Sequence, residues 1–396
     1  MADILISATS IVLLVLFFGT INGMRPKLPS DKGQDESDDG ICKSMVEPQN
    51  YVCEEHTVTT GDGYILSLQR IPVGRSGGTS VDRPPVLLQH GLMMDGSTWM
   101  LLPPEKSLAF LLVDNGFDVW IANSRGTKYS RGHAFWDWSW DELASSDLPA
   151  AFGYVQDQTR QKLHYVGHSQ GTLTALAAFL KEQLLSMLRS AALLSPIAYL
   201  GQMTSLLARN VAEGFIAETL YWLGLNEFNP TGDAVANMLK DICQKTGIDC
   251  SDLLTSFTGQ NCCTNSSVVE LLLDRKLQSS SMKNMVHLSQ MVRDGTVSMY
   301  DYEDEAENIQ QYGQPTPPSY NMTSIPNDIP LFLSYGGADA LSDVDDVKLL
   351  LRSLRDHDGD KLVIQYLDNY AHADFVMADN AREIVYNPLI AFLQLQ

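Results

Sequence analysis

A serine between two glycines, in Gly167-His-Ser-Gln-Gly171, matches the pattern of a nucleophile elbow, in which a reactive serine stands on a sharp turn between a strand and a helix. The context favours this interpretation, because Leu163-His-Tyr-Val is an apolar strand pattern and Thr172 to Leu185 is helical in pattern. The glycines prevent clashes where the chains cross, and the N-terminus of the helix favours negative charge beside the serine. We therefore predict that Ser169 is a nucleophile.

A serine hydroxyl is a poor nucleophile until a base takes its proton, and after such an elbow the chain order is Ser, Asp or Glu, then His. The histidines after Ser169 are His287, His357 and His372. We expect His287, on a helical stretch, to serve packing, and His357 lies in a charged surface turn. His372 follows a strand pattern that ends near Leu367, at the carboxyl end of a strand, where parallel sheets present their catalytic groups. It is the predicted base.

The acid is expected just past the preceding strand pattern, Leu331-Phe-Leu-Ser-Tyr. Asp339 stands there, behind two glycines that allow a tight turn. Asp343, Asp345 and Asp346 follow closely and look like the solvated first turn of the next helix. We predict that Asp339 orients the imidazole and stabilises its charged form.

Two backbone N–H groups are candidates for an oxyanion hole, which stabilises the negative oxygen formed during acyl transfer. His90-Gly-Leu92 follows the strand pattern Val86-Leu-Leu-Gln, and Gln170 follows the nucleophile. In this arrangement one donor comes from each of these positions, so Leu92 and Gln170 are the predicted donors. The alternative for His90-Gly is a simple turn at the end of a strand.

These groups need a mostly parallel sheet, covered by helices on both faces, to position them. A hairpin pattern opens the folded part, with His56-Thr-Val-Thr and Tyr64-Ile-Leu-Ser-Leu-Gln around a turn at Gly61-Asp-Gly63. Short, continuously apolar strand patterns then alternate with helical stretches, which is typical of an α/β architecture. The strand patterns are Val86-Leu-Leu-Gln, Asp118-Val-Trp-Ile-Ala, Leu163-His-Tyr-Val, Ala191-Ala-Leu-Leu, Leu331-Phe-Leu-Ser-Tyr and Leu362-Val-Ile-Gln-Tyr-Leu.

The interval 196–327 differs from the rest of the chain in being helical in pattern. Leu207, Val211, Phe215 and Leu220 share roughly one helical face. We interpret this interval as an inserted helical cap over the carboxyl end of the sheet, with residues 41–195 and 328–396 forming the α/β core. The alternative is an ordinary continuation of the core fold.

Composition favours a globular protein with uncharged partners. Of 396 residues, 44% are hydrophobic and 19% charged, and the net charge is −21. Such a surface repels nucleic acid and anionic membranes. The acidity has two open explanations: solubility alone, or adaptation to an acidic compartment in which carboxylates titrate.

The N-terminus is typical of a secretory signal. Residues 1–23 contain the apolar run Ile11-Val-Leu-Leu-Val-Leu-Phe-Phe, which is shorter than the roughly 20 residues of a membrane span. No Lys or Arg precedes the run, and an uncleaved anchor is the alternative. Residues 24–40 form a polar leader. Two glycosylation sequons, at Asn265 and Asn321, become relevant if the chain enters the secretory route.

Six cysteines are present, and behind a signal peptide they can form disulfides. They lack the His partners and the paired spacing of a zinc site. Cys42 and Cys53 can pair, although nothing in the sequence requires it. Cys262 and Cys263 are adjacent and are expected to bond poorly to one another, so at least one of them should be free or paired elsewhere.

Taken together, these stretches resemble the acid lipase family of α/β-hydrolases, which includes the gastric and lysosomal lipases, and most of all its plant members, the triacylglycerol lipases. The resemblance covers nearly the whole chain after the leader. It rests on Cys53-Glu-Glu-His-Thr-Val-Thr-Thr, Gly63-Tyr-Ile-Leu, Gln89-His-Gly-Leu, Asn115-Gly-Phe-Asp-Val-Trp, Asp141-Glu-Leu, Asp147-Leu-Pro-Ala, Tyr165-Val-Gly-His-Ser-Gln-Gly and Gly336-Gly-Ala-Asp.

The resemblance implies an α/β-hydrolase fold, hydrolysis of carboxylic esters of lipids, a helical cap with a lid, glycosylation and no cofactor. The family's nucleophile, acid and base correspond to Ser169, Asp339 and His372, and its oxyanion donors to Leu92 and Gln170.

Two further features of the resemblance concern a disulfide and a loop. The family's cap disulfide corresponds to Cys243 and Cys250, with a different spacing, and the loop from Ser130-Arg131 to Phe135 is shorter than is usual in the family.

The leading hypothesis is therefore a serine hydrolase that cleaves triacylglycerol or steryl esters at an oil–water interface. The alternative is a carboxylesterase or thioesterase acting on soluble acyl esters, because a fold alone does not separate these activities. A protein that kept the fold for binding and lost catalysis is a third class, disfavoured by the complete set of catalytic residues. Candidate lid residues, with permanent core of the cap as their alternative role, are Leu206, Leu207, Phe215, Ile216, Tyr221, Trp222 and Leu223.

Overall fold

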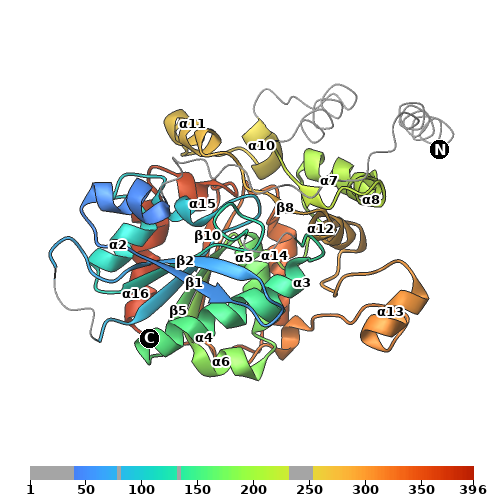
Figure 1. Cartoon of the computed structure of the whole chain (residues 1–396), viewed down its shortest axis with the longest axis horizontal. Coiled ribbons are helices and arrows are strands. Elements are labelled where there is room, and N and C mark those ends of the chain that lie inside the picture. Colours follow the sequence, from blue (N-terminus) through green and yellow to red (C-terminus); the bar gives the residue numbers. More distant parts are fainter. Residues whose placement is uncertain (1–39, 78–81, 132–134, 232–252) are drawn as a thin grey trace, which may run out of the picture. The chain divides into compact units, whose positions relative to one another are not determined.

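A mostly parallel sheet organises the part of the chain that the computed structural model describes, residues 40–77, 82–131, 135–231 and 253–396, and there it has eight strands (Figure 1). The strand order is β1-β2-β4-β3-β5-β6-β9-β10. β1 and β2 pair antiparallel, as do β2 and β4, and the remaining neighbours are parallel. The predicted α/β-hydrolase architecture is confirmed.

The strands of this sheet are β1 (Glu54–Thr59), β2 (Ile65–Ile71), β3 (Pro85–Gln89), β4 (Asp118–Ala122), β5 (Leu163–His168), β6 (Leu188–Leu194), β9 (Leu331–Gly336) and β10 (Leu362–Leu367). The helices of the α/β core are α2 (Leu108–Asp114), α3 (Trp140–Glu142), α4 (Leu148–Thr159), α5 (Gln170–Ala178), α6 (Glu182–Met187), α14 (Val344–Ser353), α15 (Asp374–Met377) and α16 (Asn387–Gln394). The sequence patterns located each of these strands, and the predicted hairpin is the antiparallel pair β1–β2.

Helices cover the sheet on both faces because successive strand residues point to opposite sides. In β3, Leu87 belongs to one buried apolar cluster, which includes residues of α4, α5 and α6. Its neighbours Val86 and Leu88 belong to a second cluster, which includes residues of α2 and α16. Every residue of β3 is buried, which explains why its sequence is continuously apolar rather than alternating.

The interval 196–327 contributes a separate group of helices. α12 packs against α7 and α8, and α8 and α12 share a small apolar cluster with Tyr300 and Phe228. Gln278 of this interval donates its N–H to the carbonyl of Met93, in the loop after β3. Its elements are α7 (Leu206–Glu213), α8 (Ile216–Trp222), β7 (Glu227–Phe228), α10 (Leu253–Thr258), α11 (Ser266–Asp274), β8 (Ser280–Ser281), α12 (Met282–Asp294) and α13 (Glu305–Tyr312).

Two predicted helical segments are interrupted. The helix expected over 172–185 is two helices, because the N–H groups of Leu180 and Lys181 bond three residues back and end α5. The single face expected for Leu207 to Leu220 is also wrong. α7 ends at Glu213, and Phe215 follows in the left-handed region with φ 51°, so Leu207 is buried while Phe215 is exposed.

Several sequence predictions lie outside the described residues. These are the signal peptide over 1–23, nearly all of the leader over 24–40, the Cys243–Cys250 disulfide and residues 132–134 of the short loop. Within the residues that are described, no helix is long and apolar enough to cross a membrane.

Candidate active site

Ser169 stands on a sharp turn between β5 and α5, as the glycine pattern predicts. It follows His168, the last residue of β5, and precedes Gln170, the first residue of α5. Its backbone has φ 55° and ψ −126°, a sparsely populated region for a residue with a side chain. Ser169 is partly exposed while both neighbours are buried. The turn therefore leaves the Ser169 side chain accessible from outside the protein.

Close packing between β3 and the elbow requires a glycine after the serine. A Cβ atom at Gly171 would lie 2.7 Å from the carbonyl oxygen of Gln89 and 2.9 Å from that of His90. Real Cβ atoms do not approach backbone oxygens so closely, so a larger residue here would push β3 and α5 apart. The second glycine of the motif thus brings the end of β3 to the nucleophile.

His372 and Asp339 form a buried hydrogen-bonded pair. His372 Nδ1 lies 3.0 Å from Asp339 Oδ1 and 2.9 Å from Oδ2. Burial acts to raise the pKa of Asp339, but His372 and the N–H groups of Leu341 and Ser342 outweigh it and lower that pKa. Asp339 is therefore an ionised acceptor, which fixes a proton on Nδ1 of His372 and leaves Nε2 as the acceptor nitrogen of the neutral ring. This is the protonation state that a general base needs.

His168 links the base to the nucleophile turn. Its ring centroid lies 4.9 Å from that of His372, and its Nε2 lies 3.0 Å from the His372 carbonyl oxygen. Burial, reinforced by His372, lowers the pKa of His168 to about 3, so the ring is neutral and Nε2 donates to that carbonyl. His168 was not predicted as a site residue; its position next to Ser169 was the available signal.

A buried carboxylate, that of Asp374, anchors the end of the loop over residues 368–373, which carries His372 and is called the base loop below. Asp374 has no exposed surface and accepts four hydrogen bonds. The donors are the N–H groups of Ala371, Cys262 and Cys263 and the hydroxyl of Thr264. Residues 262–264 are thereby joined to the chain on both sides of His372, at Ala371 and at Asp374. Sequence reasoning missed Asp374, because nothing in its own neighbourhood indicates that residues 262–264 approach it.

The two predicted oxyanion donors come from segments that meet at Ser169. A Cβ atom at Gly91 would lie 2.7 Å from Ser169 Cβ and 3.2 Å from its Oγ, so the backbone before Leu92 lies against the serine. Gln170 follows Ser169 directly. Both predicted donor residues line a small pocket, whose walls also include Met93, Met94, Leu143, Thr174 and Ser280. Ser169 itself is not among the lining residues, so the pocket adjoins the nucleophile turn through Gly91 and Gln170.

The other histidines and aspartates have structural positions. His287 is buried in α12 and stacks on Trp140 with ring centroids 4.5 Å apart, which confirms packing. Asp343 caps α14 and accepts the N–H of Asp345, as a residue at a solvated first turn can. The expectation for Asp346 was wrong: it is 2% exposed and accepts the N–H of Gln202, because the interval after β6 packs over this helix end.

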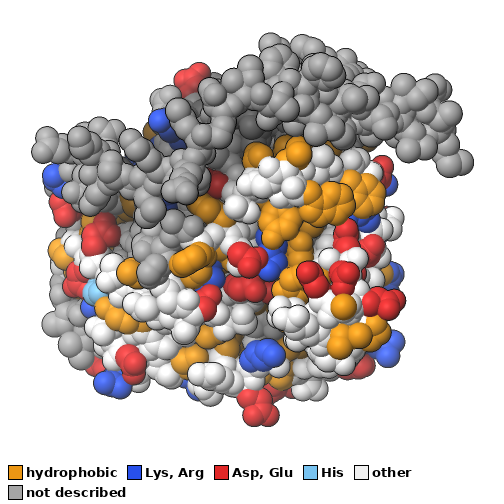
Figure 2. Space-filling view, turned by 45° about the vertical axis from the view of Figure 1, so that its right-hand side comes forward, with side chains coloured by type: hydrophobic (Ala, Val, Ile, Leu, Met, Phe, Trp, Pro, Cys, Tyr) orange, Lys and Arg blue, Asp and Glu red, His pale blue; other side chains and the backbone are white. Residues whose placement is uncertain are grey.

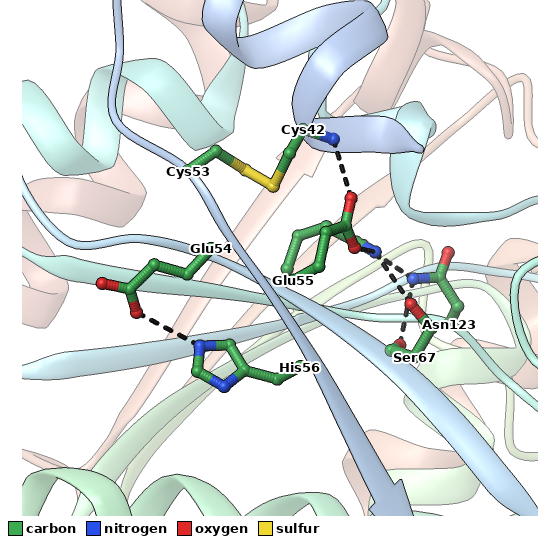
Figure 3. The surroundings of a disulfide bond; sticks show 8 residues. Cys42, Cys53, Glu54, Glu55, His56, Ser67 and Asn123 are labelled. Atoms are coloured by element: carbon green, nitrogen blue, oxygen red, sulfur yellow. Dashed lines mark hydrogen bonds and ion pairs between the residues drawn. A yellow bond between two sulfur atoms is a disulfide. The ribbon is translucent and has the colours of Figure 1, made fainter. Parts of the chain in front are cut away.

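The structure contains the Cys42–Cys53 disulfide, which the sequence allowed but did not require (Figure 3). The expectation for Cys262 and Cys263 was wrong, since the two are bonded to each other. In an extended segment, successive side chains would point to opposite sides. Here both N–H groups donate to the same Asp374 carboxylate, so the backbone bends around it and the two sulfur atoms meet.

The sequon asparagines Asn265 and Asn321 are both exposed, so a glycan could be attached at either without unfolding. Each lies at a helix start, where its side-chain oxygen accepts a backbone N–H, from Ser267 and Thr323 respectively. Within the described ranges, no group of three or more His, Cys, Asp or Glu side chains could hold a metal ion.

Comparisons with known proteins agree with this geometry. Residues 84–373 match a family model described as the alpha/beta hydrolase fold, and residues 42–102 match one described as a partial alpha/beta-hydrolase lipase region. Triacylglycerol lipase 2 of Arabidopsis thaliana is 47% identical, over 96% of this chain and 92% of that protein. Gastric triacylglycerol lipase of Homo sapiens is 33% identical, over 96% of each.

The fold also matches solved structures at low sequence identity. One is a soluble variant of monoglyceride lipase from Saccharomyces cerevisiae, with a TM-score of 0.53 and 16% identity over 85% of this chain and 94% of that one. At this level of identity the similarity concerns the fold alone.

Proposed function

This chain belongs to the triacylglycerol lipase family of α/β-hydrolases, and we propose that it cleaves carboxylic esters of neutral lipids, triacylglycerols or steryl esters, through an acyl-enzyme on Ser169. The observation that carries the proposal is the buried Asp339–His372 pair packed beside the strained turn of Ser169. A carboxylate, an imidazole and an exposed serine on such a turn are the groups that acyl transfer needs.

In the proposed acylation step, His372 Nε2 takes the proton of Ser169 Oγ as that oxygen bonds to the ester carbonyl carbon. The N–H groups of Leu92 and Gln170 stabilise the negative carbonyl oxygen. The ester C–O bond then breaks, and the alcohol leaves with the proton from His372. Water attacks the acyl-enzyme by the same route, releases the fatty acid and restores the serine hydroxyl. No cofactor takes part.

Substitution of the three side chains tests this assignment. Ser169→Ala and His372→Ala should each lower kcat by about 10⁶-fold, because nucleophile and base act as a unit. Asp339→Asn should cost less. Labelling by a fluorophosphonate probe should occur in the wild type and be lost in Ser169→Ala. An active Ser169→Ala protein would contradict the proposed mechanism, and an unlabelled, inactive wild type would favour a binding protein.

The lipid substrate is supported by an apolar surface on α7 and α8. Leu206, Phe215, Trp222 and Leu223 are exposed, with Trp222 at 71%, so the core role is wrong for these four candidates and the lid role remains proposed. Of the other three, Leu207 is buried core, and Ile216 and Tyr221 are partly buried. Figure 2 shows apolar side chains gathered on the face that carries these helices. With a net charge of −21, adsorption to lipid must come from apolar area.

A double substitution separates lipid esters from soluble esters as the substrate class. Fully burying a large apolar side chain is worth about 1.5–3 kcal/mol, so losing two should weaken adsorption by roughly 100-fold or more. Phe215→Ser with Trp222→Ser should therefore lose activity on an emulsified triglyceride and keep activity on a short soluble ester. Leu395→Ser, which removes a side chain that is 83% exposed elsewhere, is the matched control. Equal activity of the double variant and the control on the emulsion would favour a soluble-ester carboxylesterase or thioesterase.

We also propose that the protein follows the secretory pathway, to the extracellular space or a vacuolar or lysosomal compartment. The Cys42–Cys53 disulfide supports an oxidising environment, and the exposed sequons at Asn265 and Asn321 are open to glycosylation. Asn265→Gln and Asn321→Gln should each remove one glycan, seen as faster migration, and endoglycosidase treatment should no longer change the migration of the double variant. Unaltered migration of both variants would contradict glycosylation at these sites.

A further inference from the structure

Both ring nitrogens of His90 are engaged in the loop that leads to Leu92. His90 follows β3 and is 3% exposed. Its Nε2 lies 3.1 Å from the backbone N–H of Ser124, and its Nδ1 lies 2.8 Å from the carbonyl oxygen of Gly91. The Ser124 N–H can only donate, so Nε2 is the acceptor and Nδ1 of a neutral ring carries the hydrogen. Nδ1 therefore donates to the Gly91 carbonyl.

That carbonyl belongs to the same planar peptide unit as the Leu92 N–H, so the two groups cannot turn independently. We propose that His90 is a positioning residue, which holds the Gly91–Leu92 peptide in the orientation that directs the Leu92 N–H to the oxyanion. This inference rests on the proposed serine-hydrolase function. Because both of its ring nitrogens are engaged within the protein, His90 is not a proton carrier.

The loop needs such an anchor because its own backbone holds the peptide weakly. The turn bond from the Met94 N–H to the Gly91 carbonyl is long, at 3.4 Å. Met93 has φ 60°, a region that costs a residue with a side chain about 1 kcal/mol or more. A buried N–H donor at 2.8 Å from the same carbonyl is the shorter contact and comes from a side chain fixed by β3 and Ser124.

Two amide substitutions separate this role from simple packing. An Asn side chain at position 90 can place its N–H₂ where Nδ1 stands, whereas a Gln side chain reaches the position of Nε2. We expect His90→Gln to lower kcat on a soluble ester by about 100-fold, near the loss of one oxyanion donor, with KM nearly unchanged. His90→Asn should stay within about 5-fold of the wild type. Equal kcat values for the two variants would overturn the inference.

The affinities of two inhibitors distinguish the loss of an oxyanion donor from a general packing defect. A trifluoromethyl ketone forms a hemiketal oxyanion on the serine, whereas the alcohol of the same chain length binds without one. His90→Gln should weaken the ketone by the same factor as kcat/KM and leave the alcohol unchanged. Equal weakening of both inhibitors would mean a general packing loss. If His90→Gln does not fold, His90→Ala replaces it, and an unchanged ketone affinity there overturns the inference.

The proposed function can fail separately. An active Ser169→Ala protein would remove the acyl-enzyme and with it the basis for an oxyanion. If Ser169→Ala is inactive and His90→Gln behaves like His90→Asn, only the inference on His90 is lost.

Discussion

Replacing His287 by Gln should make the protein less sensitive to acid. The imidazole is 1% exposed, stacks on Trp140, and has its Nε2 2.9 Å from the carbonyl oxygen of Ser298. Its buried Nδ1 has no hydrogen-bond partner among the described residues. A Gln side chain can donate to the same carbonyl and does not titrate. The variant therefore removes the proton-binding site and keeps the hydrogen bond.

The expected size follows from the pKa of His287, which burial lowers from 6.5 to about 4. The unfolded chain binds a proton below pH 6.5, whereas the folded protein does not until about pH 4. The stabilisation that the neutral ring provides is thus complete above pH 6.5 and is lost as the pH falls toward about 4. At about 1.4 kcal/mol per pH unit, acidification from about pH 6.5 to about pH 5 costs the wild type roughly 2 kcal/mol.

Asp141 titrates in the same range, but it is present in both proteins, so its effect drops out when His287→Gln is compared with the wild type. Asp141 Oδ2 lies 3.9 Å from Nδ1, but burial raises the pKa of Asp141 to about 6, so it is largely protonated in the lower half of the window. Glu142 and Lys283 act on the pKa of His287 in opposite directions, upward and downward respectively. Tyr300 and Tyr320, which donate to Asp141 through a backbone N–H and a hydroxyl, stay neutral throughout this range.

Urea unfolding between about pH 7 and about pH 5 measures the effect. The free energy of unfolding of His287→Gln relative to the wild type should rise by roughly 2 kcal/mol across this range. His357→Gln is the control, because it removes a ring with the same kind of Nε2 bond, to the Ile329 carbonyl, from a surface turn. Parallel pH curves for His287→Gln and the wild type would refute the reasoning. An inactive His287→Gln beside an active His372→Ala would overturn the assignment of the base.

Three further predictions concern stability and the base loop. Cys42→Ser should lower the free energy of unfolding by about 3 kcal/mol in chemical denaturation, because the disulfide closes a loop of 11 residues; an unchanged midpoint would mean that the bond does not form. Arg125→Met should cost about 3–5 kcal/mol, because it leaves the buried Asp147 carboxylate without its cation, and adding Asp147→Asn should recover part of that loss in the same assay. Gly336→Ala should reduce kcat together with the melting temperature, because a Cβ there would lie 2.0 Å from the Tyr370 carbonyl oxygen at the start of the base loop, and full activity with normal stability would show that this loop adapts freely.

The sequence by itself located the sheet and the candidate catalytic residues because these depend on local signals. Buried parallel strands are continuously apolar, and the turn around Ser169 needs small residues at fixed positions. The chain order then left few choices for acid and base. Asp339 and His372 each follow a recognisable strand, and at the carboxyl edge of a parallel sheet such positions meet.

Only the tertiary structure decided which groups distant segments bring together. Asp374 collects donors from residues 262–264, and this contact bends the backbone so that two adjacent cysteines bond against expectation. Phe215 is exposed and Leu207 buried because a break between two helices ends their common face, which a periodic pattern across the break does not reveal. His90 is engaged at both nitrogens only because β4 delivers the Ser124 N–H to it. Hydrogen-bond partners far apart in sequence are set by packing geometry, and no local pattern records them.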